Sequence, residues 1–118
     1  FTPIPPPQRG IKFKLKYAPH EGMFAKLGGA DIIDQIKFAA DQGFTAWEDN
    51  GMPARDAATQ SKIGKTLEQL GMTMGVFVAY GSFDRPTFTN PKSGDQDEIL
   101  KKMQEAVEIA KRTNAQWM

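Results

Sequence analysis

The chain has 118 residues, of which 40% are hydrophobic and 25% are charged, and its formal net charge is +1. A single domain of this length buries about two thirds of the surface that its unfolded chain exposes. The near-neutral charge gives no argument for binding nucleic acid or an anionic membrane surface. No apolar run reaches the roughly 20 residues of a membrane-spanning helix. There is no cysteine, which excludes disulfides, thiolate metal sites and cysteine nucleophiles and leaves both cytoplasm and periplasm open.

The first residues predict a tether followed by a strand. Residues 1–10 carry four prolines, and such segments favour extended polyproline II structure. We expect a proline-rich N-terminal tether over 1–10 and a folded domain over 11–118. From Ile11 to Tyr17 apolar residues alternate strictly with lysines, which is the period of a β-strand. Pro19 ends this strand and leaves His20 just beyond it.

The rest of the chain repeats a helix, a residue that commonly ends helices, and a strand. The helices are predicted at Asp31–Gln42, Asp56–Leu70 and Asp95–Thr113, and the stop residues are Gly43, Gly71 and Asn114. The strands that follow them are predicted at residues 44–48, 72–80 and 115–118. This alternation predicts an α/β fold with parallel strands and right-handed crossovers. The long apolar run of the third strand is typical of a strand buried on both faces.

Three polar side chains stand where the first three predicted strands end: His20, Glu48 and Tyr80. In a parallel α/β sheet the carboxyl ends of the strands share one edge, and ligands bind there. We therefore predict these three as substrate-binding residues. A structural role without any ligand stays open for each of the three residues. His20 can be a solvated histidine, Glu48 a surface acid, and Tyr80 a core aromatic residue with its hydroxyl at the rim.

Other signals favour structural roles. Gly64-Lys65-Thr66 resembles the tail of a phosphate-binding loop, but Thr59 stands where that motif requires glycine. Asp95 and Asp97 are better interpreted as acids that stabilise a helix N-terminus than as a calcium loop. Trp47 is expected to pack between a strand and a helix.

Four stretches resemble the hydroxypyruvate isomerase-like branch of the xylose isomerase-like (β/α)8 barrels. They are KLKYAPHEGMF at 14–24, GFTAWEDNGM at 43–52, GVFVAYGSF at 75–83 and NAQWM at 114–118. The resemblance implies that the parallel βα units form the N-terminal part of a TIM (β/α)8 barrel, truncated at strand four. It also implies an aldose–ketose type isomerase. In that family a proton moves through an enediol between two glutamates around a divalent metal ion.

The resemblance supplies no catalytic residue and no metal ligand, because those of the family come from later strands. It supplies only the substrate-facing residues His20, Glu48 and Tyr80. A whole barrel takes about 250 residues, so we expect this chain to be completed by a missing C-terminal part or by self-association. Two alternatives stay open: a non-catalytic small-molecule-binding α/β domain, and an epimerase- or endonuclease-type barrel of the same superfamily. The near-neutral charge argues against DNA.

Overall fold

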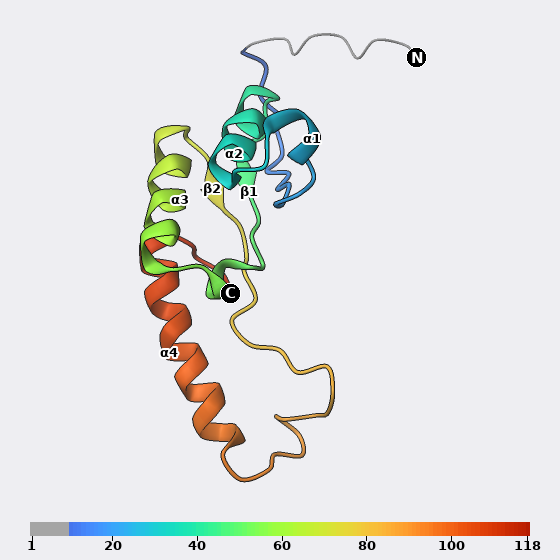
Figure 1. Ribbon diagram of the computed structural model, residues 1–118, viewed down its shortest axis with the longest axis vertical. Coiled ribbons are helices and arrows are strands. Elements are labelled where there is room, and N and C mark those ends of the chain that lie inside the picture. Colours follow the sequence, from blue (N-terminus) through green and yellow to red (C-terminus); the bar gives the residue numbers. More distant parts are fainter. Residues whose placement is uncertain (1–9) are drawn as a thin grey trace.

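A computed structural model describes residues 10–118 of the chain, so the tether predicted at residues 1–10 lies outside the described residues except for Gly10. The elements in chain order are α1 (Ala25–Gly28), α2 (Ile32–Asp41), β1 (Ala46–Trp47), the 3-10 turn η1 (Met52–Ala54), α3 (Ala57–Gln69), β2 (Thr73–Met74) and α4 (Asp95–Thr113) (Figure 1). The fold is mixed α/β and mostly helical, with a small parallel two-stranded sheet.

The three long helices lie within about a residue of their predicted bounds, because their end signals act locally. Asp31 precedes α2 and its carboxylate accepts hydrogen bonds from two N–H groups of the first turn. Asp56 caps α3 in the same way. The left-handed backbone expected after a helix is found at Gly43 (φ 97°), Gly71 (φ 66°) and Asn114 (φ 54°).

The strands follow one another in space in the order in which they occur in the sequence. β1 pairs with β2 in parallel. On the other edge of β1, a single parallel bridge joins Glu48 to His20, and the Glu48 N–H donates to the Pro19 carbonyl at 3.0 Å. Each neighbouring pair is connected through a helix, as the sequence predicts for parallel strands.

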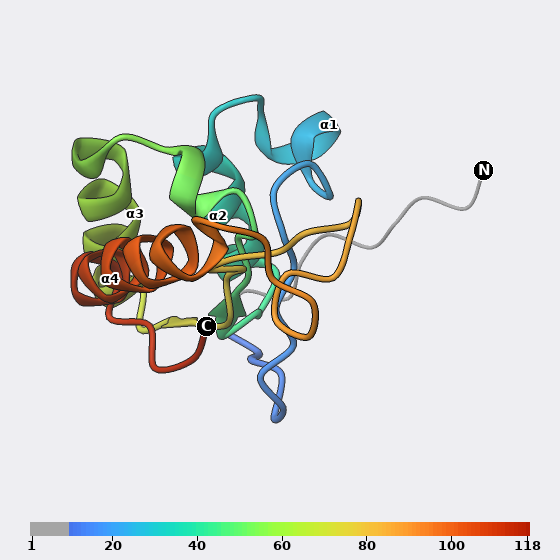
Figure 2. The ribbon, with the colours of Figure 1, turned by 90° about the horizontal axis from the view of Figure 1, so that it is seen from below.

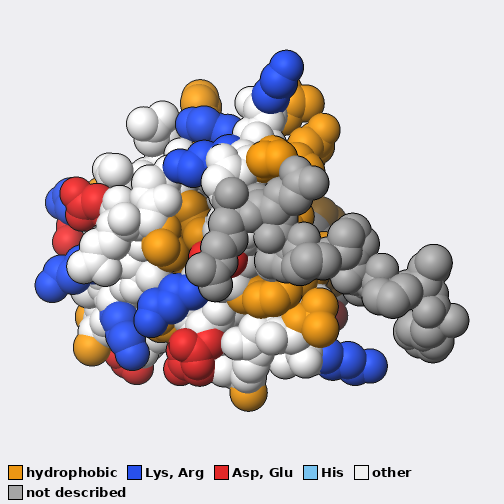
Figure 3. Space-filling model, turned by 90° about the horizontal axis from the view of Figure 1, so that it is seen from above, with side chains coloured by type: hydrophobic (Ala, Val, Ile, Leu, Met, Phe, Trp, Pro, Cys, Tyr) orange, Lys and Arg blue, Asp and Glu red, His pale blue; other side chains and the backbone are white. Residues whose placement is uncertain are grey.

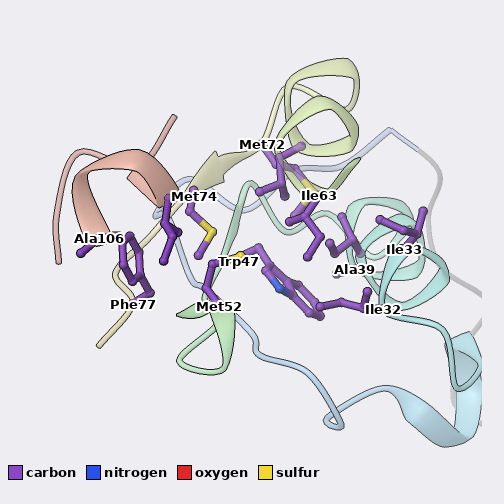
Figure 4. Close-up of a cluster of buried hydrophobic side chains, with 13 residues drawn as sticks. Ile32, Ile33, Ala39, Trp47, Met52, Ile63, Met72, Met74, Phe77 and Ala106 are labelled. Atoms are coloured by element: carbon purple, nitrogen blue, oxygen red, sulfur yellow. The ribbon is translucent and has the colours of Figure 1, made fainter. Parts of the chain in front are cut away.

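The helices lie on one side of these strands (Figure 2), and the core fills the space between. Trp47 has no exposed surface. Figure 4 shows its ring among Ile32, Ala39, Ile63 and Met52. The prediction that Trp47 packs between strand and helix is therefore confirmed.

The opposite face of the strands is concave. Lys16 Nζ reaches over β1 and donates to Thr73 Oγ1 at 3.2 Å. The Ala18 Cβ lies only 3.9 Å from the point where a Cβ on Gly75 would stand. In a flat sheet, segments on either side of one strand would be separated by roughly 9–10 Å. The three strand segments therefore curve away from the helices.

The first predicted strand, Ile11–Tyr17, is wrong. No strand is assigned there, and a bend occurs at residues 14–15. Ile11 and Leu15 are each 63% exposed. The physical reason is that this segment lacks backbone hydrogen-bond partners. It makes one backbone hydrogen bond to a distant part of the described chain, from the Phe13 N–H to the Gly43 carbonyl. Parallel pairing begins only at His20.

The third predicted strand, 72–80, is shorter than expected and is not buried on both faces. Only Thr73–Met74 is assigned as strand. Phe77 is buried on the helical side, whereas Val76 and Val78 are 45% and 50% exposed. Beyond Met74 the segment has helices on one face and no covering layer among residues 10–118 on the other.

The predicted fourth strand and one helix-face assignment also need correction. Ala115–Met118 forms no strand; a cavity of about 330 Å³, lined by Gln116, separates this segment from the edge of β2. On α4, the apolar spacing in the sequence predicts Val107 on the inner face together with Ala106 and Ala110, but Val107 is 42% exposed, whereas Ile109 and Thr113 are buried. The apolar pattern of this long helix therefore predicted where the helix lies in the sequence, but it did not predict correctly which of its faces is buried.

The Gly64-Lys65-Thr66 tripeptide lies inside α3 and serves helix packing. A Cβ on Gly64 would stand well inside contact distance of the Arg112 carbonyl oxygen on α4. The missing side chain therefore lets α3 and α4 approach closely, and this agrees with the structural interpretation of the tripeptide.

Candidate functional site

His20 and Glu48 are brought side by side by the parallel bridge between their segments. Residues that are paired across a ladder point to the same face, and successive residues alternate between faces. Trp47 points into the core, so Glu48 points to the concave face, and His20 with it. His20 is exposed and Glu48 is partly buried. Two of the three predicted site residues therefore share one end of the concave face.

The polar atoms of this pair have defined partners. The Glu48 Oε1 accepts a hydrogen bond from Asn50 Nδ2 at 2.9 Å. The His20 Nδ1 lies 2.8 Å from the Glu21 carbonyl oxygen, which can only accept. The ring proton of a neutral His20 therefore sits on Nδ1, and Nε2 is left as an acceptor. The pair offers a ligand one carboxylate and one imidazole nitrogen.

Tyr80, the third predicted site residue, is held within its own loop. Its hydroxyl donates to Thr87 Oγ1 at 3.1 Å, and its ring contacts Phe88 edge-on with centroids 5.8 Å apart. Within the part of the chain that the structure describes, no hydrogen bond or ring contact joins Tyr80 to His20 or Glu48. The structure thus assembles the pair and leaves Tyr80 apart from it.

An ionic network beneath the pair was missed by the sequence analysis. Asp49, which directly follows Glu48, is only 2% exposed. Its Oδ2 accepts from Arg55 Nε at 2.7 Å, and its Oδ1 accepts from the Gly51 N–H at 3.0 Å. Arg55 Nη2 also reaches Glu21 Oε2 at 2.6 Å. The Asp-Asn-Gly sequence signals the turn at Asp49, but nothing in the sequence links Arg55 to Glu21.

The network favours the charged form of Arg55. Desolvation by burial works to lower the pKa of the guanidinium, but hydrogen bonds and charge interactions with Asp49 and Glu21 outweigh it, so the pKa of Arg55 is raised. Removing one partner of a buried ion pair costs about 3–5 kcal/mol, because the other charge is left unpaired. Asp49 and Arg55 therefore fix the turn that follows β1.

A second ion pair ties the loop at residues 81–94 to α4. Arg85 donates two hydrogen bonds to the Asp95 carboxylate, from Nη1 to Oδ2 at 2.7 Å and from Nη2 to Oδ1 at 2.5 Å. The Lys92 N–H donates to the same carboxylate at 2.6 Å. The hydrogen bond from Arg85, followed by that from Lys92, lowers the pKa of Asp95 to about 2. Asp95 is thus an acid of the helix N-terminus, as predicted.

The described residues do not gather a metal site. Between Gly10 and Met118, no three or more histidine, aspartate or glutamate side chains lie close enough together to hold an ion. The divalent metal implied by the resemblance therefore finds no ligand set here, and no chemical step is derived through it. In the same part of the chain no helix is long and apolar enough to cross a membrane.

One further concavity lies on the helical side. A groove of about 580 Å³ runs between α2 and α3, and lysines contribute to its lining: Lys37, Lys62 and Lys65. It contains none of the predicted site residues. The candidate site is the end of the concave face that carries His20 and Glu48, because the bridge places these two predicted residues side by side.

Comparisons of the chain with protein-family models, with curated proteins and with solved structures give no match. The likeness to the isomerase-like barrels is carried by the four stretches quoted above. Function must therefore be argued from the site.

Proposed function

We propose that the chain supplies the first βα units of a xylose isomerase-like (β/α)8 barrel that interconverts hydroxycarbonyl compounds of the aldose–ketose type. Support comes from three parallel segments in sequential order, which curve with their helices outside. A closed barrel has eight parallel strands. The remaining strands would come from further chain or from another copy.

The observation that carries the proposal is the parallel bridge between His20 and Glu48. It places two polar side chains side by side, with Glu48 directly after β1, and (β/α)8 barrels bind their ligands at the carboxyl ends of their strands. In this proposal the Glu48 carboxylate accepts a hydrogen bond from a substrate hydroxyl, and His20 Nε2 accepts a second one. Tyr80 would close on the substrate from its loop. Proton transfer itself is assigned to groups outside residues 10–118.

Binding of hydroxypyruvate to the chain tests the proposal, with the amide signals of His20 and Glu48 followed by NMR. Glu48→Gln should weaken binding about tenfold, the effect of one charge-assisted hydrogen bond, and leave the melting temperature unchanged. Glu68→Gln, on the exposed surface of α3, is the matched control and should bind normally. Unchanged binding by Glu48→Gln, or shifts confined to other residues, would overturn the assignment.

A second experiment, on the completed barrel, separates the isomerase from a binding domain. If a barrel completed by its remaining strands binds hydroxypyruvate and converts none of it, the chain belongs to a non-catalytic binding domain. Formation of the isomeric aldehyde, measured by NMR of the reaction mixture, supports the isomerase.

A further inference from the structure

We propose that Arg55 is a positioning residue that fixes the separation of His20 and Glu48; the meaning of that pair rests on the proposed function. Glu21 directly follows His20, and Asp49 directly follows Glu48. Arg55 contacts both of these acids. A single guanidinium therefore joins the residue after one site side chain to the residue after the other.

We call the contacts of Arg55 with Asp49 and Glu21 the clamp, and their geometry needs an arginine. Arg55 uses Nε for Asp49 and Nη2 for Glu21, at 2.7 Å and 2.6 Å. The rigid planar fork of a guanidinium holds these two directions together, whereas a lysine is a single point charge on a flexible stem. Asp49 cannot turn away, because the Gly51 N–H holds its second oxygen.

The clamp is itself anchored to the helical layer. The Arg55 N–H donates to the Met52 carbonyl at 3.1 Å. The Arg55 carbonyl accepts from Gln60 Nε2 at 2.9 Å, and the Gln60 side chain is nearly fully buried. The position of the two strand ends is therefore set from the start of α3.

The strand ends need such a device because their own pairing is slight. His20 and Glu48 meet in an isolated bridge, whereas β1 and β2 have their own ladder. A weakly bonded segment opens independently of the rest of a protein. Without Arg55, the His20 segment should therefore separate from Glu48 while β1 and β2 stay paired.

Amide hydrogen exchange by NMR tests this directly and needs no ligand. The Glu48 N–H donates to the Pro19 carbonyl, whereas the Thr73 and Gly75 N–H groups donate to the Thr45 and Trp47 carbonyls. In Arg55→Met, protection of the Glu48 amide should fall about tenfold or more relative to that of Thr73 and Gly75. Arg55→Lys keeps a charge beside Asp49, so it should recover the melting temperature but not the protection of Glu48.

Arg85→Met is the matched control, because it breaks the other arginine–aspartate pair. It should deprotect the Lys92 amide, whose partner is Asp95, and leave Glu48 protected. Equal loss at Glu48 and Thr73 in Arg55→Met, or no loss at Glu48, would overturn the proposal.

A third variant covers the case in which Arg55→Met does not fold. Glu21→Ala removes only the arm of the clamp that is 45% exposed, and it should show a selective loss of protection at the Glu48 amide. Full protection of Glu48 in Glu21→Ala would also overturn the proposal. Failure of hydroxypyruvate to bind would count against the proposed function alone, since exchange is measured without ligand.

Discussion

At the scale of single residues, Gly64 sets how closely α3 and α4 approach. An added Cβ would overlap the Arg112 carbonyl oxygen, and backbone cannot move aside as a side-chain end can. Gly64→Ala should therefore lower the free energy of unfolding: overlap costs about 1–3 kcal/mol or more, and alanine recovers about 1 kcal/mol of helix propensity. Urea denaturation measures the change. Ser61→Ala on the same helix is the control and should be neutral or stabilising; equal behaviour of both variants would contradict the packing role.

Asp95 predicts a loss of stability in acid. Its folded pKa is about 2 against an ordinary 3.8, so the folded state favours the charged carboxylate. This contribution is fully present above the ordinary value and is lost as the pH falls through the folded one. Denaturation followed across this window should show a shallower fall for Asp95→Asn. Asp97→Asn, exposed in the same turn, should keep the original profile, and a matching change in it would exclude Asp95 as the cause.

At the scale of elements, α2 depends on its N-cap. Asp31 Oδ1 accepts from the Ile33 N–H at 2.8 Å and from the Asp34 N–H at 3.4 Å. Asp31→Ala should lower the free energy of unfolding by about 1 kcal/mol, because these helix donors lose their acceptor. Asp31→Asn keeps an acceptor and should stay close to the parent. Thermal melts followed by circular dichroism compare the three proteins, and an Asp31→Ala melt at the parent temperature would contradict the cap.

The strands behave differently from the helices at this scale. β1 and β2 are each assigned over two residues, although their sequences are apolar for longer. A strand is completed by hydrogen bonds to its neighbours, so its observed length depends on how many neighbours are present. The predicted strands at Ile11–Tyr17 and 115–118 lack such neighbours among the described residues.

At the scale of the whole molecule, apolar side chains are left open to solvent. Large exposed hydrophobic residues include Phe13, Leu15, Val76, Val78 and Trp117. Figure 3 shows hydrophobic side chains exposed between basic ones at one end of the molecule. Exposed hydrophobic side chains favour association, and unpaired strand edges add to the tendency.

We therefore expect the chain to self-associate in solution. The double variant Val76→Asp and Val78→Asp should shift sedimentation toward monomer and leave the unfolding midpoint little changed, because both side chains are half exposed. Phe77→Asp, between them, is the contrasting control and should unfold the chain, since Phe77 is only 1% exposed. A parent chain that sediments as a single monomer with a cooperative melt would contradict the incomplete-barrel proposal itself.

The sequence by itself determined the three long helices and the residues that end them. The cap formed by Asp31 and the left-handed Asn114 follow from signals within a few residues, because a helix satisfies its hydrogen bonds within its own segment. The packing of Trp47 between a strand and a helix was also predicted from the sequence, and Trp47 has no exposed surface.

Only the tertiary structure decided how much of each strand forms and which charges meet. Pairing of Glu48 with the His20 segment, and of Arg55 with both Asp49 and Glu21, joins positions far apart in the chain. Such contacts depend on where distant segments lie in the folded chain, and a local sequence pattern does not predict those positions. The exposure of Val76 and the burial of Asp49 follow from the same cause: one face of the strands is covered by helices and the other is concave and open.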